Sequence, residues 1–193
     1  SSSTIINNYL RFQWAKILGD CVDSGINPGI TFIETGIQLI KQNVEEKPKL
    51  TANWLLLGQY TNLLIEEKLK LQEEGVIDFP PEEKERLKQE ANTAFEKALN
   101  LSPKRQEIYK NWLQTDILTE DYEKAKEKAQ KCIDLNPVLG SCHWLMAITQ
   151  AYLGNEDGFL HHSSLAKERK YNTESEEPLQ HLVTMYFRTG NFE

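Results

Sequence analysis

The sequence has few cysteines, no long apolar run and no excess of basic residues, and each shortage excludes a class of protein. Cys21, Cys132 and Cys142 are three scattered cysteines among 193 residues, unlike the even, closely spaced set of a disulfide-stapled domain. No stretch approaches the roughly 18 apolar residues of a membrane-spanning helix. The net charge of −7 offers no basic field to nucleic acid or anionic lipid. We therefore expect no nucleic-acid binding and no direct membrane insertion of this chain.

Motifs of catalysis and cofactor binding are also missing. The sequence contains no G-x-S-x-G, no Walker phosphate loop, no Rossmann glycine pattern and no H-E-x-x-H. We expect a protein that is not an enzyme, with no catalytic residues, no cofactor and no bound metal.

One group of metal-ligand residue types needs its own argument: Cys142, His143, His161, His162 and His181. Cys142 and His143 begin one predicted helix, and His161 and His162 lie on its expected antiparallel neighbour, an arrangement compatible with zinc. Adjacent residues of a helix point about 100° apart, so His161 and His162 rarely reach one ion. We favour surface or packed histidines. We interpret Cys132 as a buried thiol because its position takes a small apolar residue.

The sequence does contain a repeated motif. Residues 101–137 begin with Leu-Ser-Pro at 101–103 and end with Leu-Asn-Pro at 135–137, and the two prolines are 34 residues apart (137 − 103). Between them the pattern predicts a helix, a polar break at 119–121 and a second helix. A 34-residue helix–turn–helix period that closes on proline is the signature of the tetratricopeptide repeat (TPR). The chain resembles a TPR array, which implies an all-α solenoid of antiparallel helix pairs in a superhelix.

The rest of the chain is interpreted as further copies of this unit. Residues 1–29 form an N-terminal helix, expected over 5–20, and a turn that serves as a cap or linker. The array covers 30–193. Its members are the second helix of a degenerate repeat (30–48), an extended repeat (51–103), two repeats (104–137 and 138–172) and a half repeat (174–193).

The extended repeat combines a well-matched first helix with an insertion. Trp54, Leu57 and Gly58 occupy the W-x2-L-G positions, but the A-x3-F-x2-A pattern of a second helix begins only at Ala91. From Pro48 to Pro103 there are 55 residues (103 − 48), which is 21 more than the 34-residue period (55 − 34). The excess, 67–88, is charged and helix-forming. We expect both helices to gain about two turns and to project as a hairpin.

The TPR resemblance implies a binding surface, because the first helix of each pair lines the concave side of such arrays. The residues predicted to bind a peptide there are Leu55, Gln59, Asn62, Lys110, Asn111, Gln114, Trp144, Ile148 and Gln180. This mixture of polar and apolar residues suits a partner's helix or extended segment. A clamp for a peptide carboxylate needs more basic and amide groups than Lys110 and Asn111 supply. For Leu55 and Trp144, a role in contacts between repeats is an equally good interpretation.

A narrower resemblance rests on residues 44–172. It is carried by NWLLLGQY at 53–60, the insertion, AFEKAL at 94–99, LSPKRQEIY at 101–109 and GSCHW at 140–144. Together these resemble the TPR tail of O-antigen ligase/polymerase-like proteins of small-genome bacteria. The resemblance implies that this chain is the soluble, extracytoplasmic part of a membrane-anchored protein, whose catalytic residues lie elsewhere. The start at Ser1 and the end inside a repeat lead us to expect a fragment.

Three functional hypotheses follow. The first is a non-enzymatic scaffold with a protein or peptide ligand in its groove and glycan-assembly proteins among its partners. The second is an accessory domain that contacts the glycan or its lipid carrier. The third is a free cytoplasmic adaptor. Fold alone does not choose among them.

Overall fold

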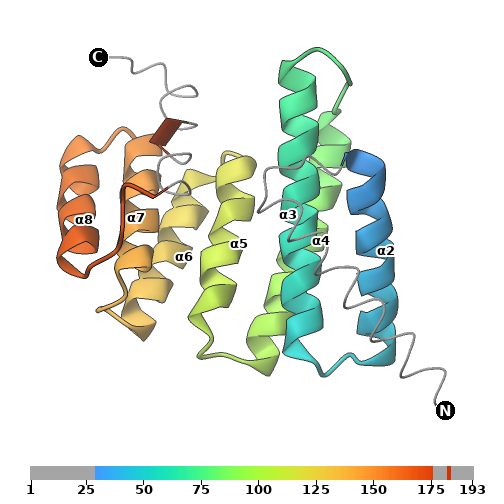
Figure 1. Cartoon of the computed structure of the whole chain (residues 1–193), viewed down its shortest axis with the longest axis horizontal. Coiled ribbons are helices and arrows are strands. Elements are labelled where there is room, and N and C mark those ends of the chain that lie inside the picture. Colours follow the sequence, from blue (N-terminus) through green and yellow to red (C-terminus); the bar gives the residue numbers. More distant parts are fainter. Residues whose placement is uncertain (1–28, 176–181, 184–193) are drawn as a thin grey trace. The chain divides into compact units, whose positions relative to one another are not determined.

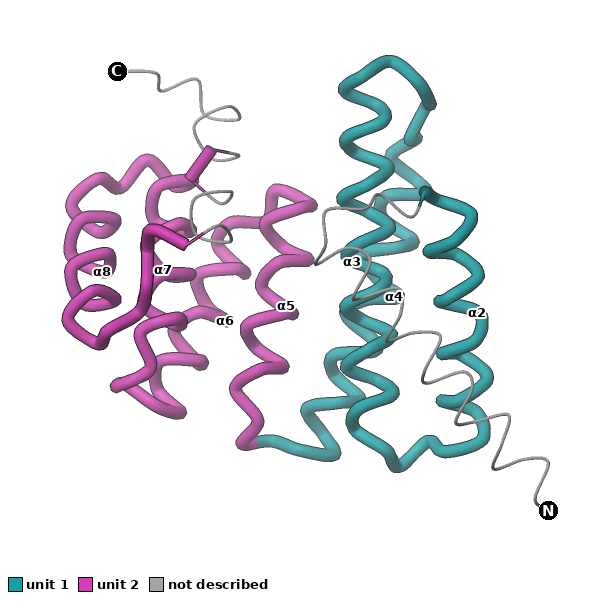
Figure 2. The backbone as a smooth tube through the Cα atoms, viewed as in Figure 1, with its two compact units in different colours: residues 1–103 teal, residues 104–193 magenta. Residues whose placement is uncertain are grey.

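The computed structural model describes residues 29–175 together with 182 and 183; the helix expected over 5–20 lies outside them. This part of the chain forms seven helices and no strand: α2 (Ile30–Glu46), α3 (Thr51–Glu73), α4 (Pro81–Leu101), α5 (Gln106–Leu118), α6 (Tyr122–Leu135), α7 (Gly140–Tyr152) and α8 (Glu156–Glu168) (Figure 1). The all-α class built from helix pairs is confirmed. The chain divides into two compact units, Ser1–Pro103 and Lys104–Glu193 (Figure 2).

In the first unit α3 packs against both α2 and α4. The side chains of α2 that face this core form the apolar stripe expected from their spacing: Ile33, Ile37, Ile40 and Val44. Where α3 meets α4, Gly58 makes room for a ring, since a Cβ atom at this position would lie 2.5 Å from Cζ of Phe95. The Phe95 side chain is fully buried. A small residue thus lets two helices approach, and an aromatic ring fills the space between them.

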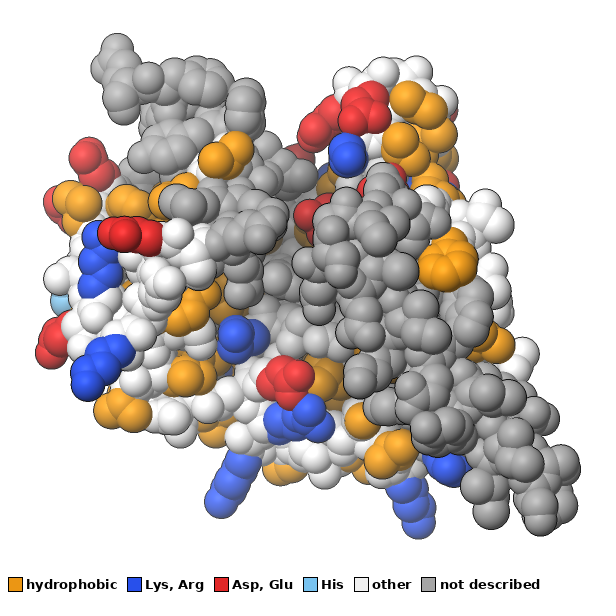
Figure 3. Space-filling view, viewed as in Figure 1, with side chains coloured by type: hydrophobic (Ala, Val, Ile, Leu, Met, Phe, Trp, Pro, Cys, Tyr) orange, Lys and Arg blue, Asp and Glu red, His pale blue; other side chains and the backbone are white. Residues whose placement is uncertain are grey.

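The hairpin of α3 and α4 is extended as the sequence predicts. These helices have 23 and 21 residues, against 13 in α5 and 14 in α6. The extension has a small core of its own, in which Phe79 is 3% exposed and the Lys68 ammonium lies 5.8 Å from its ring centroid. The same ammonium donates to Glu83 at 3.0 Å. Figure 3 shows acidic side chains beside apolar ones at the tip, where Val76 is 64% exposed.

In the second unit the helices pack in chain order, α5 with α6, α6 with α7 and α7 with α8. Leu113, Ala129 and Met146 belong to a cluster that joins α5, α6 and α7. Tyr171 stands where the repeat pattern expects proline, and the structure gives it a packing role. Its ring lies 6.4 Å from that of Trp144, and its Cβ atom would be 2.7 Å from a Cβ at Gly140.

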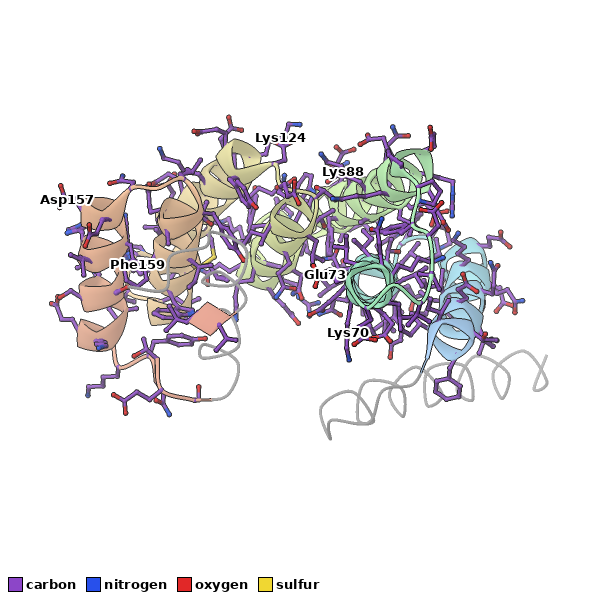
Figure 4. All side chains as sticks on the ribbon, turned by 90° about the horizontal axis from the view of Figure 1, so that it is seen from above. Lys70, Glu73, Lys88, Lys124, Asp157 and Phe159 are labelled. Atoms are coloured by element: carbon purple, nitrogen blue, oxygen red, sulfur yellow. A yellow bond between two sulfur atoms is a disulfide. The ribbon has the colours of Figure 1, made fainter. Side chains whose placement is uncertain are left out.

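The structure corrects the expectation of a buried free thiol at Cys132. Cys132 on α6 and Cys142 on α7 are joined by a disulfide, with 5.7 Å between their Cα atoms, a separation typical of such bonds. Figure 4 shows this bond in yellow. Both residues are fully buried. The count of three scattered cysteines misled because the nine residues between these two, 133–141, form a turn with a helix end on each side and bring the two sulfurs together.

Replacing Gly58 by alanine is expected to destabilise the first unit. The added methyl group would overlap the buried Phe95 ring, and overpacking of this kind costs about 1 to 3 kcal/mol. Urea unfolding followed by circular dichroism measures the loss. Thr93→Ala on the exposed side of α4 is the control, with a change below about 0.5 kcal/mol expected. Equal stability of Gly58→Ala and wild type would contradict the helix approach described here.

Candidate functional site

The predicted concave-face residues do not all reach the surface. Gln180 lies outside the described residues. The four buried members are Leu55, Asn62, Trp144 and Ile148, which are 3%, 5%, 2% and 1% exposed. The four partly exposed members are Gln59 on α3 and Lys110, Asn111 and Gln114 on α5. The prediction of a binding surface therefore depends on these four.

Trp144 and Ile148 are occupied by contacts within the second unit. They form a cluster with Ala166 on α8, and Tyr171 and Leu182 pack against it. Every residue of α7 from Gly140 to Gln150 is buried. The interpretation of Trp144 as core, which the sequence left open, is the one that this geometry favours. In the second unit, the predicted binding residues that a ligand can contact are therefore those on α5.

The polar side chains of α5 lie on the face opposite its buried anchor. At about 100° per residue, Lys110 and Gln114 point away from Trp112 and Asp116. Asp116 is fully buried and accepts a hydrogen bond from Lys128 of α6. The Lys128 ammonium also lies 4.6 Å from the centroid of the Trp112 ring, within the range of a cation–π contact. This ion pair fixes α6 on α5 and so holds the polar face of α5 in position.

A cleft that sequence reasoning missed lies in the first unit. Its volume is about 510 Å³, and its lining combines apolar and charged side chains: Ile37, Leu64 and Leu87 with Glu34, Lys41, Arg86 and Glu90. The size is within the range of ligand sites. An ion pair joins α2 to α4 across the cleft, with 2.8 Å between Lys41 Nζ and Glu90 Oε1. In the sequence these charges resemble solvated helix faces, and only the packing of α2 and α4 against α3 brings them to one cleft.

Two histidines meet between α7 and α8. Nδ1 of His143 and Nδ1 of His162 are 3.2 Å apart, and Nε2 of His143 is 3.0 Å from the carbonyl oxygen of Pro137. Burial lowers the pKa of both imidazoles, and that of His162 falls to about 4. His161 is exposed. Cys142, a further candidate ligand in the sequence, is bound in the disulfide.

His181, the last candidate, lies outside the described residues. Among the residues that the structure describes, no group of three or more His, Cys, Asp or Glu side chains is arranged to hold a metal ion. No helix in this described part is long and apolar enough to cross a membrane.

Comparison with solved structures identifies the fold. The thermophilic TPR protein TTC0263 from Thermus thermophilus is similar, with a TM-score of 0.63 and 13% identity over 82% of this chain and 74% of that one. A chain described as MamA MSR-1 C2 gives a TM-score of 0.53 and 14% identity over 72% of this chain and 67% of that one. The fold is TPR-like, a helical-repeat solenoid, as predicted.

The sequence comparisons add no narrower assignment. No protein-family model matches this chain, and no curated protein matches it. The resemblance to O-antigen ligase tails finds no support in these comparisons and remains a proposal.

The histidine pair predicts a loss of stability in acid. The folded-state pKa of each imidazole is lowered, so folding favours the neutral form. This contribution is complete above the unfolded pKa of about 6.5 and is lost as the pH falls toward about 4. In urea unfolding at pH 7.5 and pH 4.5, His162→Gln should lose about 1 to 2 kcal/mol less than wild type on acidification, less than the full pKa shift implies because water screens this partly exposed ring. His161→Gln should behave as wild type; a wild-type pH dependence in His162→Gln would contradict the assignment.

Proposed function

We infer that this chain is a non-enzymatic interaction module that binds a segment of a partner protein. The TPR-like fold supports this, because its helix pairs present one side of each helix to solvent along the array. The main structural support is α5, where Lys110, Asn111 and Gln114 are partly exposed and the buried Asp116–Lys128 pair fixes the helix behind them. A preorganised helix face loses little entropy when a ligand binds.

The chemistry of this face points to a mixed ligand. Lys110 donates hydrogen bonds from a positive charge, the amides of Asn111 and Gln114 both donate and accept, and Ile117 adds a partly buried apolar contact. A helix or extended segment with a carboxylate near an apolar side chain fits these groups. The single lysine argues against tight capture of a C-terminal carboxylate, for which several cations converge.

A photo-crosslinking amino acid at position 114 tests this surface. In cells that make the full-length protein, it should form a covalent adduct with one partner, while the same group at the exposed position 127 of α6 should not. Mass spectrometry identifies the partner, and binding of the purified partner is then measured. Lys110→Glu should weaken binding by about 1 kcal/mol or more, and Lys104→Glu should not. Equal adducts at 114 and 127, or binding indifferent to Lys110→Glu, would refute the surface.

We place the module outside the cytoplasm, as the tail of a membrane-anchored protein of surface glycan assembly. The resemblance over residues 44–172 supports this, as does the Cys132–Cys142 disulfide, because such bonds persist in oxidising compartments and are rare in the cytosol. Two other accounts compete with it. One is an accessory domain that contacts the glycan or its lipid carrier, and the other is a free cytoplasmic adaptor.

Cell fractionation separates these accounts. We expect the native full-length product to remain in membranes washed with alkaline carbonate, with Cys132 and Cys142 protected from alkylation in acid-quenched, denatured samples until a reductant is added. Recovery in the soluble fraction with both thiols alkylated would establish the cytoplasmic adaptor instead. Glycan binding by the isolated chain that survives Lys110→Glu would favour the accessory domain.

A further inference from the structure

The His143–His162 contact has a defined protonation pattern. The carbonyl oxygen of Pro137 accepts a hydrogen bond from Arg169 Nε at 2.6 Å and lies 3.0 Å from His143 Nε2. A carbonyl only accepts, so Nε2 of His143 must carry a hydrogen. In the neutral ring, Nδ1 of His143 then holds a lone pair, and Nδ1 of His162 lies within hydrogen-bond distance of it, 3.2 Å away.

This geometry resembles half of a metal site. Two imidazole nitrogens bound to one tetrahedral ion at about 2.0–2.1 Å are about 3.3 Å apart, close to the 3.2 Å observed. In metal sites, the second nitrogen of a histidine ligand typically donates to a backbone carbonyl, which fixes the tautomer and orients the ring. Pro137 has this role toward His143. The two rings come from α7 and α8, so helix packing, and not a flexible loop, holds both nitrogens.

We propose that His143 Nδ1 and His162 Nδ1 together bind one transition-metal ion of borderline softness, Cu²⁺, Ni²⁺ or Zn²⁺, whose remaining positions are filled by water. The ion takes the place of the Nδ1–Nδ1 hydrogen bond, and the hydrogen of His162 moves from Nδ1 to Nε2, so that both rings bind as neutral imidazoles. It joins α7 to α8, so the bound ion stabilises the last complete helix pair. This goes against the sequence-based expectation of no bound metal, and beyond the interaction module inferred above.

The surroundings set the selectivity and the limit of affinity. His143 is 4% exposed and His162 is partly exposed, so an ion would enter the pair from the side of His162. The charged and titratable groups that face the pair are Arg169 and His161, neither of which adds an anionic ligand. Two neutral nitrogens without a carboxylate disfavour Mg²⁺ and Ca²⁺, and the order of affinity should be Cu²⁺ above Ni²⁺ and Zn²⁺.

Titration calorimetry on the untagged full chain at pH 7.5 tests the site. Cu²⁺, Ni²⁺ and Zn²⁺ should bind one ion per chain and raise the melting temperature, while Mg²⁺ should do neither. His162→Gln should weaken binding by about tenfold or more. His161→Gln and His181→Gln should leave it within about twofold. Binding lost only in His161→Gln or His181→Gln, or no binding at millimolar metal, would overturn the proposal.

A second test uses the wild-type chain alone and so does not depend on whether the variants fold: nitrogen NMR of the histidine side chains with and without Zn²⁺. The proposal requires that Zn²⁺ shift the Nδ1 resonances of His143 and His162 and leave the His143 Nε2 hydrogen in place. A spectrum in which Zn²⁺ shifts only His161 or His181, or leaves all four histidines unchanged, would show that the pair shares a proton and holds no ion.

Discussion

Close approach of paired helices is the constraint on which this structure depends. It is possible only where one partner has almost no side chain. At Gly58 the ring of Phe95 occupies the space of a Cβ atom, and at Gly140 the backbone oxygen of Ala166 lies 2.9 Å from where that atom would be. An isolated helix pair buries too little apolar surface to fold alone. Each unit is therefore stabilised by contacts between consecutive helices. Side chains outside these contacts can take on other roles, such as binding a ligand.

Much of this fold could be predicted because its information is periodic. The spacing of Pro103 and Pro137 gave the repeat length, and the surplus residues before Pro103 gave the extended hairpin. Features that depend on which helices face each other could not be predicted from the sequence. Cys132 and Cys142 meet only because α6 and α7 pack together, and the cleft of the first unit forms only because α2 and α4 both pack against α3. Trp144 was ambiguous because core and groove positions of a first helix have the same residue preferences.

The second unit carries a different specific link at each consecutive helix contact. The Asp116–Lys128 ion pair joins α5 to α6, the disulfide joins α6 to α7, and the histidine pair joins α7 to α8. The buried ion pair contributes little net stability, whereas the disulfide stabilises the fold covalently. All three links penalise any register in which their partners are separated. In a solenoid, where neighbouring repeats are alike and slippage is the natural error, such links define a single alignment of the helices.

The disulfide also determines how a pulling force travels along the chain. A covalent bond between residues 132 and 142 gives tension a shorter route than the backbone between them. Residues 133–141 therefore bear no load, and the turn that contains Pro137 keeps its shape while helices on either side are stretched. The Pro137 carbonyl, which accepts hydrogen bonds from His143 and Arg169, lies inside this segment that carries no tension. When the two ends of the chain are pulled apart, other segments would unfold before this turn.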